Sequence, residues 1–557
     1  MRIGMLAGLG LWLAACGSAP PSSDQSDASS EVSEAAIVRA FTGGTIYTGN
    51  GLETVETVLV DEAGRIAATS SDPSLVWDDT VETINLDGAV MYPGFTDAHI
   101  HLLGIGQREL TLDLAGTGSV AELVDRIEAE IESAATGAII FGRGWIETGW
   151  PEDRMPLASD LDPVAPDNPV ILIRADGHAL VANTAALNLA GIDDTTPDVD
   201  GGKIERGEDG NATGILIDNA MAPVTTLIAE PSESDLIAAY AVGAAEYASR
   251  GWTGGHNMSV SANHAVLMER LDLEGRLPLR LHNNFDQNGV DIAAERLHET
   301  DTITNRSVKL YMDGALGSRG ALLIEPYSDR PETSGLSLME PDALATFMET
   351  AHDRDVQLAI HAIGDLANRR ILDVFDAGDY SADDRWRIEH TQILHPDDIE
   401  RLASLGLIAS MQPSHAIGDL KFAPARLGLA RLRGAYAWNS LLDAGALVVG
   451  GSDAPVEVGS PLIEFYAAVA RKDLQGFSDE GWHPEEALSR TQALALFTTA
   501  PAYSAFMEDE LGTIEVGKLA DFSVFDRDLM TIPEAEILQA ETVMTVVQGE
   551  VVYSGSK

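Results

Sequence analysis

Eight short apolar segments recur through the middle of the chain, and each ends in polar residues that often include histidine. They span residues 94–101, 251–258, 277–284, 308–314, 356–365, 385–392, 407–415 and 446–455. Helical patterns fill several of the gaps, for example at 234–250 and 342–354. Strands that alternate with helices are typical of a parallel sheet, and a closed (β/α)8, TIM-like barrel requires eight of them. We therefore expect an α/β fold with the barrel at 93–508 and any active site at the carboxyl ends of its strands.

The first two of these segments are separated by residues 102–250, which is far more than one connecting helix. This stretch contains a further strand-like run at 168–181 and a hairpin pattern at 201–218. An insertion that follows a barrel strand lies on the active-site face. We expect residues 102–250 to form an insertion that can act as a substrate lid.

Short strand patterns also occur on both sides of the barrel. Residues 37–92 alternate apolar and polar side chains and break at Gly and Asp, and residues 511–526 and 541–555 read the same way. Two strand-rich segments at opposite ends of a chain can form one unit. We expect a small β-sandwich domain built from residues 37–92 and 509–557.

The first 36 residues have a different character. Residues 1–15 combine a single Arg with an apolar run of signal-peptide length, and Leu-Ala-Ala before Cys16 resembles the lipobox of bacterial lipoproteins. Residues 16–36 are small, polar and acidic, which predicts a flexible tether. The resemblance implies lipidation at Cys16 and anchoring to a membrane of the bacterial cell envelope, facing the periplasm or in the outer membrane. The alternative is an ordinary signal peptide with a chance cysteine.

Charge and cysteine content exclude several classes of protein. The formal net charge is −53, from 35 basic and 88 acidic residues, and such a surface repels nucleic acid. Cys16 is the single cysteine, which excludes intramolecular disulfides and cysteine-ligated zinc. No stretch in the body of the chain has about 18 consecutive apolar residues, so we expect the lipid anchor to be the only membrane contact.

Histidines and one aspartate at the predicted strand ends suggest a metal site. His99 and His101 are two residues apart, so on a strand their imidazoles point to the same side and can share one metal. His361, His390 and Asp453 end the fifth, sixth and eighth segments. All five are side chains that bind divalent metals, and barrel closure would bring them to the barrel axis.

These motifs resemble the amidohydrolase superfamily, and within it the YtcJ-like (amidohydrolase 3) group that includes N-substituted formamide deformylases. The resemblance covers roughly residues 38–555. It is carried by PGFTDAHIH, RADGHALVANTAAL, VKLYMDGALGSRGA, IHAIGD, RIEH, GSDAP and the closing LGTIEVGKLADFSVFD.

The resemblance implies a barrel with one or two divalent metals. Zn is the first expectation, and Fe, Mn and Co are the alternatives. His99 and His101 would hold the more buried metal together with Asp453, and His361 and His390 the more exposed one. Lys309 matches the lysine that several superfamily members carboxylate with CO2 to bridge two metals. Its alternative role is a salt-bridging or substrate-binding lysine.

The implied reaction is hydrolysis of a carbon–nitrogen bond other than a peptide bond, in an amide or formamide, by water that the metal activates. Asp453 would be the general base. His178, Asp313 and Arg319 are candidate substrate contacts. His178 could instead pack within the lid, Asp313 could fix its loop, and Arg319 could brace the loop after the fourth strand.

Two other interpretations stay open at this stage. The same activated water would serve a hydrolytic deaminase or an esterase. The other interpretation is a lipid-anchored binding protein that kept the barrel and lost catalytic activity, although the intact set of predicted ligands argues against it. The expected partner is a small-molecule amide, and a homo-oligomer is compatible with the sequence.

Overall fold

The computed structural model describes residues 36–72, 75–114, 116–147, 150–174, 177, 179–199, 202–228, 231–478 and 482–555. The predicted signal peptide, Cys16, nearly all of the predicted tether and His178 lie outside these ranges. Within them, no helix is both long enough and apolar enough to cross a membrane.

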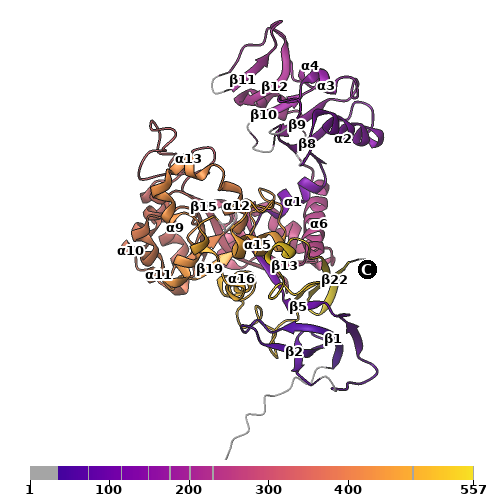
Figure 1. Cartoon of the computed structure of the whole chain (residues 1–557), viewed down its shortest axis with the longest axis vertical. Coiled ribbons are helices and arrows are strands. Elements are labelled where there is room, and N and C mark those ends of the chain that lie inside the picture. Colours follow the sequence, from indigo (N-terminus) through magenta and orange to yellow (C-terminus); the bar gives the residue numbers. More distant parts are fainter. Residues whose placement is uncertain are drawn as a thin grey trace, which may run out of the picture.

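An eight-stranded parallel barrel forms the centre of the molecule, as predicted (Figure 1). Each strand overlaps one of the eight segments expected from the sequence, although the fourth strand begins five residues earlier than the predicted 308–314. The strands are β6 (Phe95–Ile100), β13 (Trp252–Val260), β14 (Arg280–Phe285), β15 (Ile303–Tyr311), β16 (Gln357–Ala362), β17 (Arg387–His390), β18 (Ile408–Met411) and β19 (Val448–Gly450).

The barrel closes where the first strand meets the segment that follows the last one. Ile100 pairs in parallel with Ala454, the backbone N–H of Asp453 donates to the carbonyl of His99 at 2.8 Å, and His101 donates to Ala454 at 2.8 Å. Closure therefore fixes His99, His101 and Asp453 next to one another through the backbone itself.

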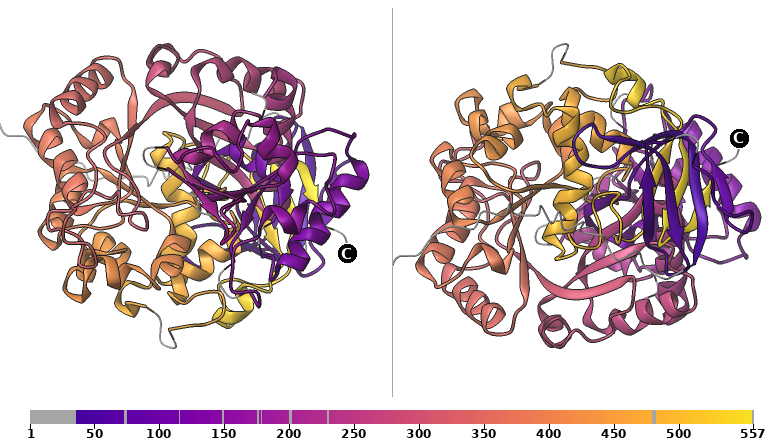
Figure 2. Two further views of the ribbon diagram at one scale, coloured as in Figure 1. Left: turned by 90° about the horizontal axis from the view of Figure 1, so that it is seen from above. Right: turned by 90° about the horizontal axis from the view of Figure 1, so that it is seen from below.

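Helices surround the strands in an outer ring (Figure 2). They include α6 (Glu233–Arg250), α7 (Ala265–Leu273), α8 (Val290–Glu295), α9 (Pro341–Asp353), α10 (Asp365–Ala377), α11 (Pro396–Leu405), α14 (Trp438–Asp443) and α16 (Arg490–Phe497). Shorter or additional helices are α1 (Leu102–Glu109), α5 (Ala222–Thr225), α12 (Pro413–Asp419), α13 (Ala423–Leu427), α15 (Pro461–Ala470), α17 (Thr499–Ser504) and α18 (Glu534–Ile537).

Helix α6 illustrates how local sequence sets these elements. Ser232 and Asp235 form a capping box at its start, which satisfies backbone N–H groups that have no partner within the helix. Gly251 ends the helix at φ 101°, a left-handed conformation that costs glycine little. The buried face, which includes Tyr240 and Tyr247, packs into the main core.

Residues 112–218 of the insertion fold around a separate six-stranded sheet, drawn above the barrel in Figure 1, whereas α1 and α6 at its two ends pack against the barrel. Its strands are β7 (Leu112–Asp113), β8 (Ile140–Trp145), β9 (Val170–Arg174), β10 (Ala179–Ala182), β11 (Gly202–Arg206) and β12 (Ala212–Asp218), with helices α2 (Val120–Ser133), α3 (Ala158–Leu161) and α4 (Thr184–Leu189). The predicted hairpin at 201–218 is β11 paired antiparallel with β12. The run at 168–181, by contrast, is two antiparallel strands, β9 and β10, rather than one.

Both ends of the chain build a second domain, as predicted (Figure 2). Its sheet has eight strands: β1 (Ile37–Tyr47), β2 (Thr54–Asp61), β3 (Ile66–Ser70), β4 (Glu82–Asn85), β5 (Val90–Pro93), β20 (Phe522–Phe525), β21 (Thr542–Val547) and β22 (Glu550–Ser554). The ends join where β20 pairs antiparallel with β5. Phe41 and Phe522, one from each end, are fully buried with ring centroids 5.3 Å apart.

Candidate metal centre

Three of the predicted ligands converge at the carboxyl end of the barrel. His99 lies near the end of β6, His390 ends β17, and Asp453 follows β19. One ligand atom from each lies within 4.8 Å of the other two. His99 is 0%, His390 5% and Asp453 7% exposed, so the cluster is shielded from solvent.

His101 and Lys309 also reach this cluster. Nε2 of His101 lies 3.2 Å from Asp453 Oδ1, and Nε2 of His99 lies 3.4 Å from the same oxygen. The Lys309 ammonium nitrogen is 3.4 Å from His99 Nε2 and the residue is 2% exposed. Burying this ammonium group is costly, and the nearby carboxylates of Glu389 and Asp453 offset part of that cost.

His361 lies beside His390, with ring centroids 4.5 Å apart. Its Nε2 is buried and has no hydrogen-bond partner among the described residues, and the nearest acidic oxygen, Asp313 Oδ1, is 3.5 Å away. The Asp313 carboxylate itself holds two loops together, because it accepts the backbone N–H groups of Leu322, Ile363 and Gly364 at 2.8–3.0 Å. This geometry matches the loop-fixing alternative for Asp313.

Two side chains that the sequence analysis did not single out orient the histidines. His99 Nδ1 lies 2.6 Å from Glu389 Oε2, and His390 Nδ1 lies 2.8 Å from Gln412 Oε1. Arg387 donates to both oxygens of Glu389. Such contacts fix the ring orientation and leave each Nε2 available to a metal. The signal was present in RIEH, where Arg387 and Glu389 are charged residues inside a strand that must be buried.

Burial controls the protonation of the cluster. It lowers the pKa of His99 to about 4 and that of His361 to about 3, with Lys309 adding to both shifts. Burial also lowers the pKa of Lys309 to about 8. Burial alone would raise the pKa of Asp453, but His99 and His101 beside it hold the value well below its usual range. At neutral pH His99 and His361 are therefore neutral and Asp453 is ionised, the forms that bind metals.

A cavity of about 400 Å³ opens above the cluster. It is lined by segments that follow β15 to β19, and His415, Asp419 and Glu457 contribute polar groups to its wall. His415 Nε2 is 3.7 Å from Asp453 Oδ2. None of the described residues of the insertion lines this cavity, so its role as a lid stays a prediction.

The structure places Arg319 away from the cavity lining. Its guanidinium donates to both oxygens of Asp329 at 3.1 and 2.8 Å, and Arg426 contacts the same carboxylate. This arrangement matches the bracing alternative for Arg319, because its charge is already paired within the loop.

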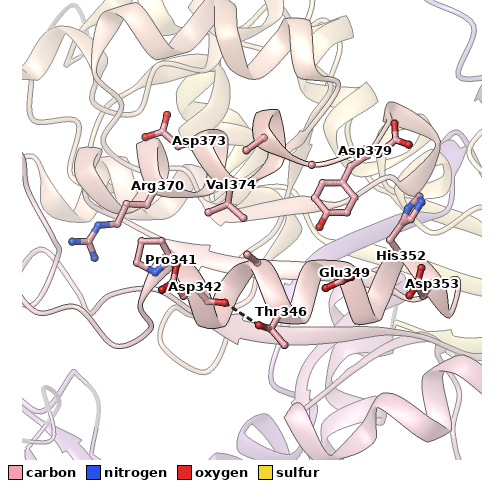
Figure 3. A pocket seen from close by; sticks show the side chains of 14 residues that line it. Pro341, Asp342, Thr346, Glu349, His352, Asp353, Arg370, Asp373, Val374 and Asp379 are labelled. Atoms are coloured by element: carbon pink, nitrogen blue, oxygen red, sulfur yellow. Dashed lines mark hydrogen bonds between the residues drawn. The ribbon is translucent and has the colours of Figure 1, made fainter.

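A larger hollow of about 800 Å³ lies on the outside of the barrel between α9 and α10 (Figure 3). The charged side chains of its wall are mostly acidic, with Asp342, Glu349 and Asp373 among those drawn. Its one histidine, His352, is paired with Asp384 at 2.8 Å. Because none of the predicted ligands reaches this hollow, we take the barrel cavity as the functional site.

The donor set of the barrel cavity suits a divalent cation. Neutral imidazole and ionised carboxylate are the ligands that Zn and related metals prefer. The Nε2 of His361, which has no hydrogen-bond partner among the described residues, is a further group that a bound cation would satisfy. Fold and site together define a metal-dependent hydrolase of the (β/α)8 barrel class.

The family of this hydrolase follows from comparison with known proteins. The Amidohydro_3 model, which describes the amidohydrolase family, matches residues 82–553, and the chain belongs to that family. YtcJ of Bacillus subtilis (strain 168) is 33% identical over 526 residues, covering 92% of this chain and 99% of its own. The N-substituted formamide deformylase of Arthrobacter pascens is 29% identical over 537 residues, covering 89% and 95%.

A solved structure supports both fold and class. The crystal structure of an uncharacterized metal-dependent hydrolase from Pyrococcus horikoshii OT3 superimposes with a TM-score of 0.73 at 28% identity. The match covers 89% of this chain and 99% of that one. The resemblance to the amidohydrolase superfamily inferred from the sequence motifs is thus confirmed over most of the chain.

Proposed function

We propose that this protein hydrolyses carbon–nitrogen bonds in small amides or formamides. The observation that carries the proposal is the convergence of His99, His390 and Asp453 within 4.8 Å at the floor of an open cavity. The similarity to an N-substituted formamide deformylase favours an amide bond over an ester or an aminopurine.

Six residues would hold the metal. His99 and His101 would bind the more buried cation with Asp453, and His361 and His390 the more exposed one. Lys309 would carry a CO2-derived carbamate between the two sites. The lowered pKa of Lys309 supports this role, because only the neutral amine reacts with CO2. Zinc suits this ligand set best.

A bound divalent cation lowers the pKa of a water molecule and polarises the substrate carbonyl. Asp453 would take a proton from that water, whose oxygen forms a bond to the carbonyl carbon. Asp453 would then give the proton to the amide nitrogen as the carbon–nitrogen bond breaks, releasing an amine and a carboxylic acid. Glu389 and Gln412 would keep the His99 and His390 rings in place through both steps.

Metal content and hydrolysis, measured on the same preparation, test the proposal. We expect close to two zinc ions per chain after expression with zinc and bicarbonate, together with release of an amine from N-substituted formamides. Release of ammonia from aminopurines, or cleavage of esters with no amide cleavage, would move the protein to another reaction of the superfamily. A chain that binds no divalent metal would overturn the proposal.

We also propose that Cys16 anchors the protein to the bacterial cell envelope. Support comes from the Leu-Ala-Ala-Cys sequence and the polar tether that follows it. Several acyl chains give stable membrane attachment. Wild-type protein should partition into a detergent phase, and a Cys16→Ser variant into the aqueous phase. Equal partitioning of the two would contradict lipidation.

A further inference from the structure

Two cavities meet at His101. The larger, of about 400 Å³, lies above the ends of β15 to β19 and contains the metal ligands. The smaller, of about 170 Å³, lies above β6 and β13. His101 lines both cavities, and Tyr311 of the larger contacts Ser259 of the smaller through their hydroxyl groups. Both cavities therefore border His101, one of the predicted metal ligands.

The larger cavity has an acidic wall. Glu457 Oε1 lies 4.0 Å from His415 Nε2, and no described residue donates a hydrogen bond to the Glu457 carboxylate. Asp419 accepts from Gln392 and Tyr436, both at 2.5 Å and both on Oδ2, which leaves Oδ1 without a donor among the described residues. Burial raises the pKa of both Asp419 and Glu457, a cost that a bound cation would relieve.

Positive charge is scarce on the same wall. Among the described lining residues, Lys309 is the single lysine or arginine, and it lies beside His99. Arg319 and Arg426 are both paired with Asp329. Among the described residues, the cavity therefore offers no lysine or arginine to a substrate carboxylate away from the predicted metal ligands.

The smaller cavity is neutral. Its described polar lining consists of hydroxyl, amide and imidazole groups, from Tyr240, Asn257, Ser259, Ser261 and His264 with His101 at the edge. Tyr240 and His264 pair with each other at 3.0 Å. Its volume of about 170 Å³ is less than half that of the larger cavity, so it suits the shorter part of a substrate.

Asp453 sets the direction in which the substrate lies. In the proposed function, on which this inference rests, Asp453 gives its proton to the leaving nitrogen. Its Oδ2 faces His415, on the side of Asp419 and Glu457. The amine half therefore extends into the larger cavity, and the acyl half is left with the smaller one.

We propose that the substrate is an amide that joins a short, uncharged acyl group to a larger amine bearing a second, positively charged group. Glu457 and Asp419 bind that charge, and the smaller cavity limits the length of the acyl group. Neither residue takes part in the bond-breaking step, so both determine specificity rather than catalysis.

Three matched formamides test the charge preference with the zinc-loaded full chain. They are N-formyl benzylamines with a para aminomethyl, ethyl or carboxymethyl group, which are cationic, neutral and anionic at pH 7. We expect kcat/KM for the cation to exceed that for the neutral compound by about tenfold, mainly through KM, and the anion to be the poorest. Glu457→Gln and Asp419→Asn should each reduce this preference by about threefold or more.

A charge control is needed because the net charge of −53 attracts any cation to the surface. Asp397 is exposed on α11, with 85% of its side chain accessible, and lies outside both cavities. Asp397→Asn should leave the cation preference unchanged, and the preference should persist at about 0.5 M salt, where surface charges are screened.

A second series varies the acyl group on the cationic amine, from formyl through butanoyl to octanoyl. We expect kcat/KM to fall by about tenfold or more between butanoyl and octanoyl, because the longer chain exceeds the smaller cavity. An octanoyl amide that reacts as fast as the formyl amide would overturn this part of the inference.

The outcomes separate this inference from the proposed function. Hydrolysis of all three formamides with no cation preference would overturn the inference and leave amide hydrolysis standing. Hydrolysis of none would overturn the proposed function. In that case, calorimetry with benzyltrimethylammonium still tests whether the acidic wall binds a cation. Binding that is weakened in Glu457→Gln and retained in Asp397→Asn supports the inference. Equal binding by the wild type, Glu457→Gln and Asp397→Asn overturns it.

Discussion

Glu389 Oε2 lies 2.6 Å from His99 Nδ1, and both side chains are fully buried. A carboxylate on the far nitrogen of a metal-binding histidine fixes its tautomer and increases its basicity. Glu389→Gln should therefore weaken zinc binding by about 10- to 100-fold, measured by competition with a chromophoric chelator.

The matched control for that variant is Glu486→Gln. Glu486 is 5% exposed and accepts the N–H and hydroxyl of Ser440, but it lies outside the described lining of the barrel cavity. Its replacement should lower the thermal midpoint and leave zinc affinity unchanged. Equal zinc affinity in wild type and Glu389→Gln would show that His99 is oriented without its carboxylate partner.

Asp453→Asn tests the general base. The amide cannot accept and return a proton at neutral pH, so kcat should fall by about 10²- to 10⁴-fold on any amide that the wild type hydrolyses. Zinc content, measured by mass spectrometry on the same protein, separates loss of the base from loss of metal. A kcat within about threefold of wild type, with metal bound, would assign the base to another residue.

Lys309 is predicted to bridge two cations as a carbamate. Lys309→Ala should reduce bound zinc from two ions per chain to one or fewer, and native mass spectra of the wild type should show an added CO2. Lys421→Ala is the control, because that lysine has 64% of its side chain exposed and pairs with Asp473. One zinc per chain in both wild type and Lys309→Ala would indicate a mononuclear site.

Sequence patterns predicted the barrel because two features are strong in this chain. Each strand is a short apolar run, and the predicted metal ligands fall at the ends of these runs, where barrel closure must bring them together. His99, His390 and Asp453 could be placed in one cluster from spacing alone. The insertion was harder, because β9 and β10 both fall within the single strand-like run predicted at 168–181.

The pairings that orient the site were not evident in the sequence. Gln412 reaches His390 through the register of β17 and β18, and a lone glutamine carries no pattern. Arg387 and Glu389 contrast with their apolar neighbours, yet the histidine they support lies 290 residues away from Glu389. Such pairings depend on tertiary packing, which local patterns do not encode.

His282 gives a pH dependence of stability. Burial lowers its pKa from 6.5 to about 3, so between those values the unfolded chain binds a proton that the folded chain does not. Stability from this group is therefore present above pH 6.5 and is lost as pH falls towards 3, by at most about 1.4 kcal/mol per pH unit.

Thermal melts at pH 6.5 and 5 measure this effect. The midpoint should fall with acidification in the wild type and fall less steeply in His282→Gln, which cannot take up the proton. His352→Gln is the control, because 42% of the His352 side chain is exposed to solvent, and its slope should match the wild type. Identical slopes in all three proteins would exclude His282 as a contributor.

Asp313 tests whether the loops after β15 and β16 are held by one carboxylate. It is 1% exposed and accepts three backbone N–H groups, and an amide oxygen in Asp313→Asn would satisfy fewer of them. Each buried N–H left without an acceptor costs about 1–3 kcal/mol. The variant should therefore melt at a lower temperature than the wild type.

The same variant separates a structural from a substrate-binding role. Because Asp313 Oδ1 is 3.5 Å from His361 Nε2, loosening the loop should also weaken the more exposed metal site, and zinc bound per chain should fall. KM for substrates should change little at saturating zinc if Asp313 only positions the loops. A large rise in KM with an unchanged melting temperature would instead place Asp313 in contact with the substrate.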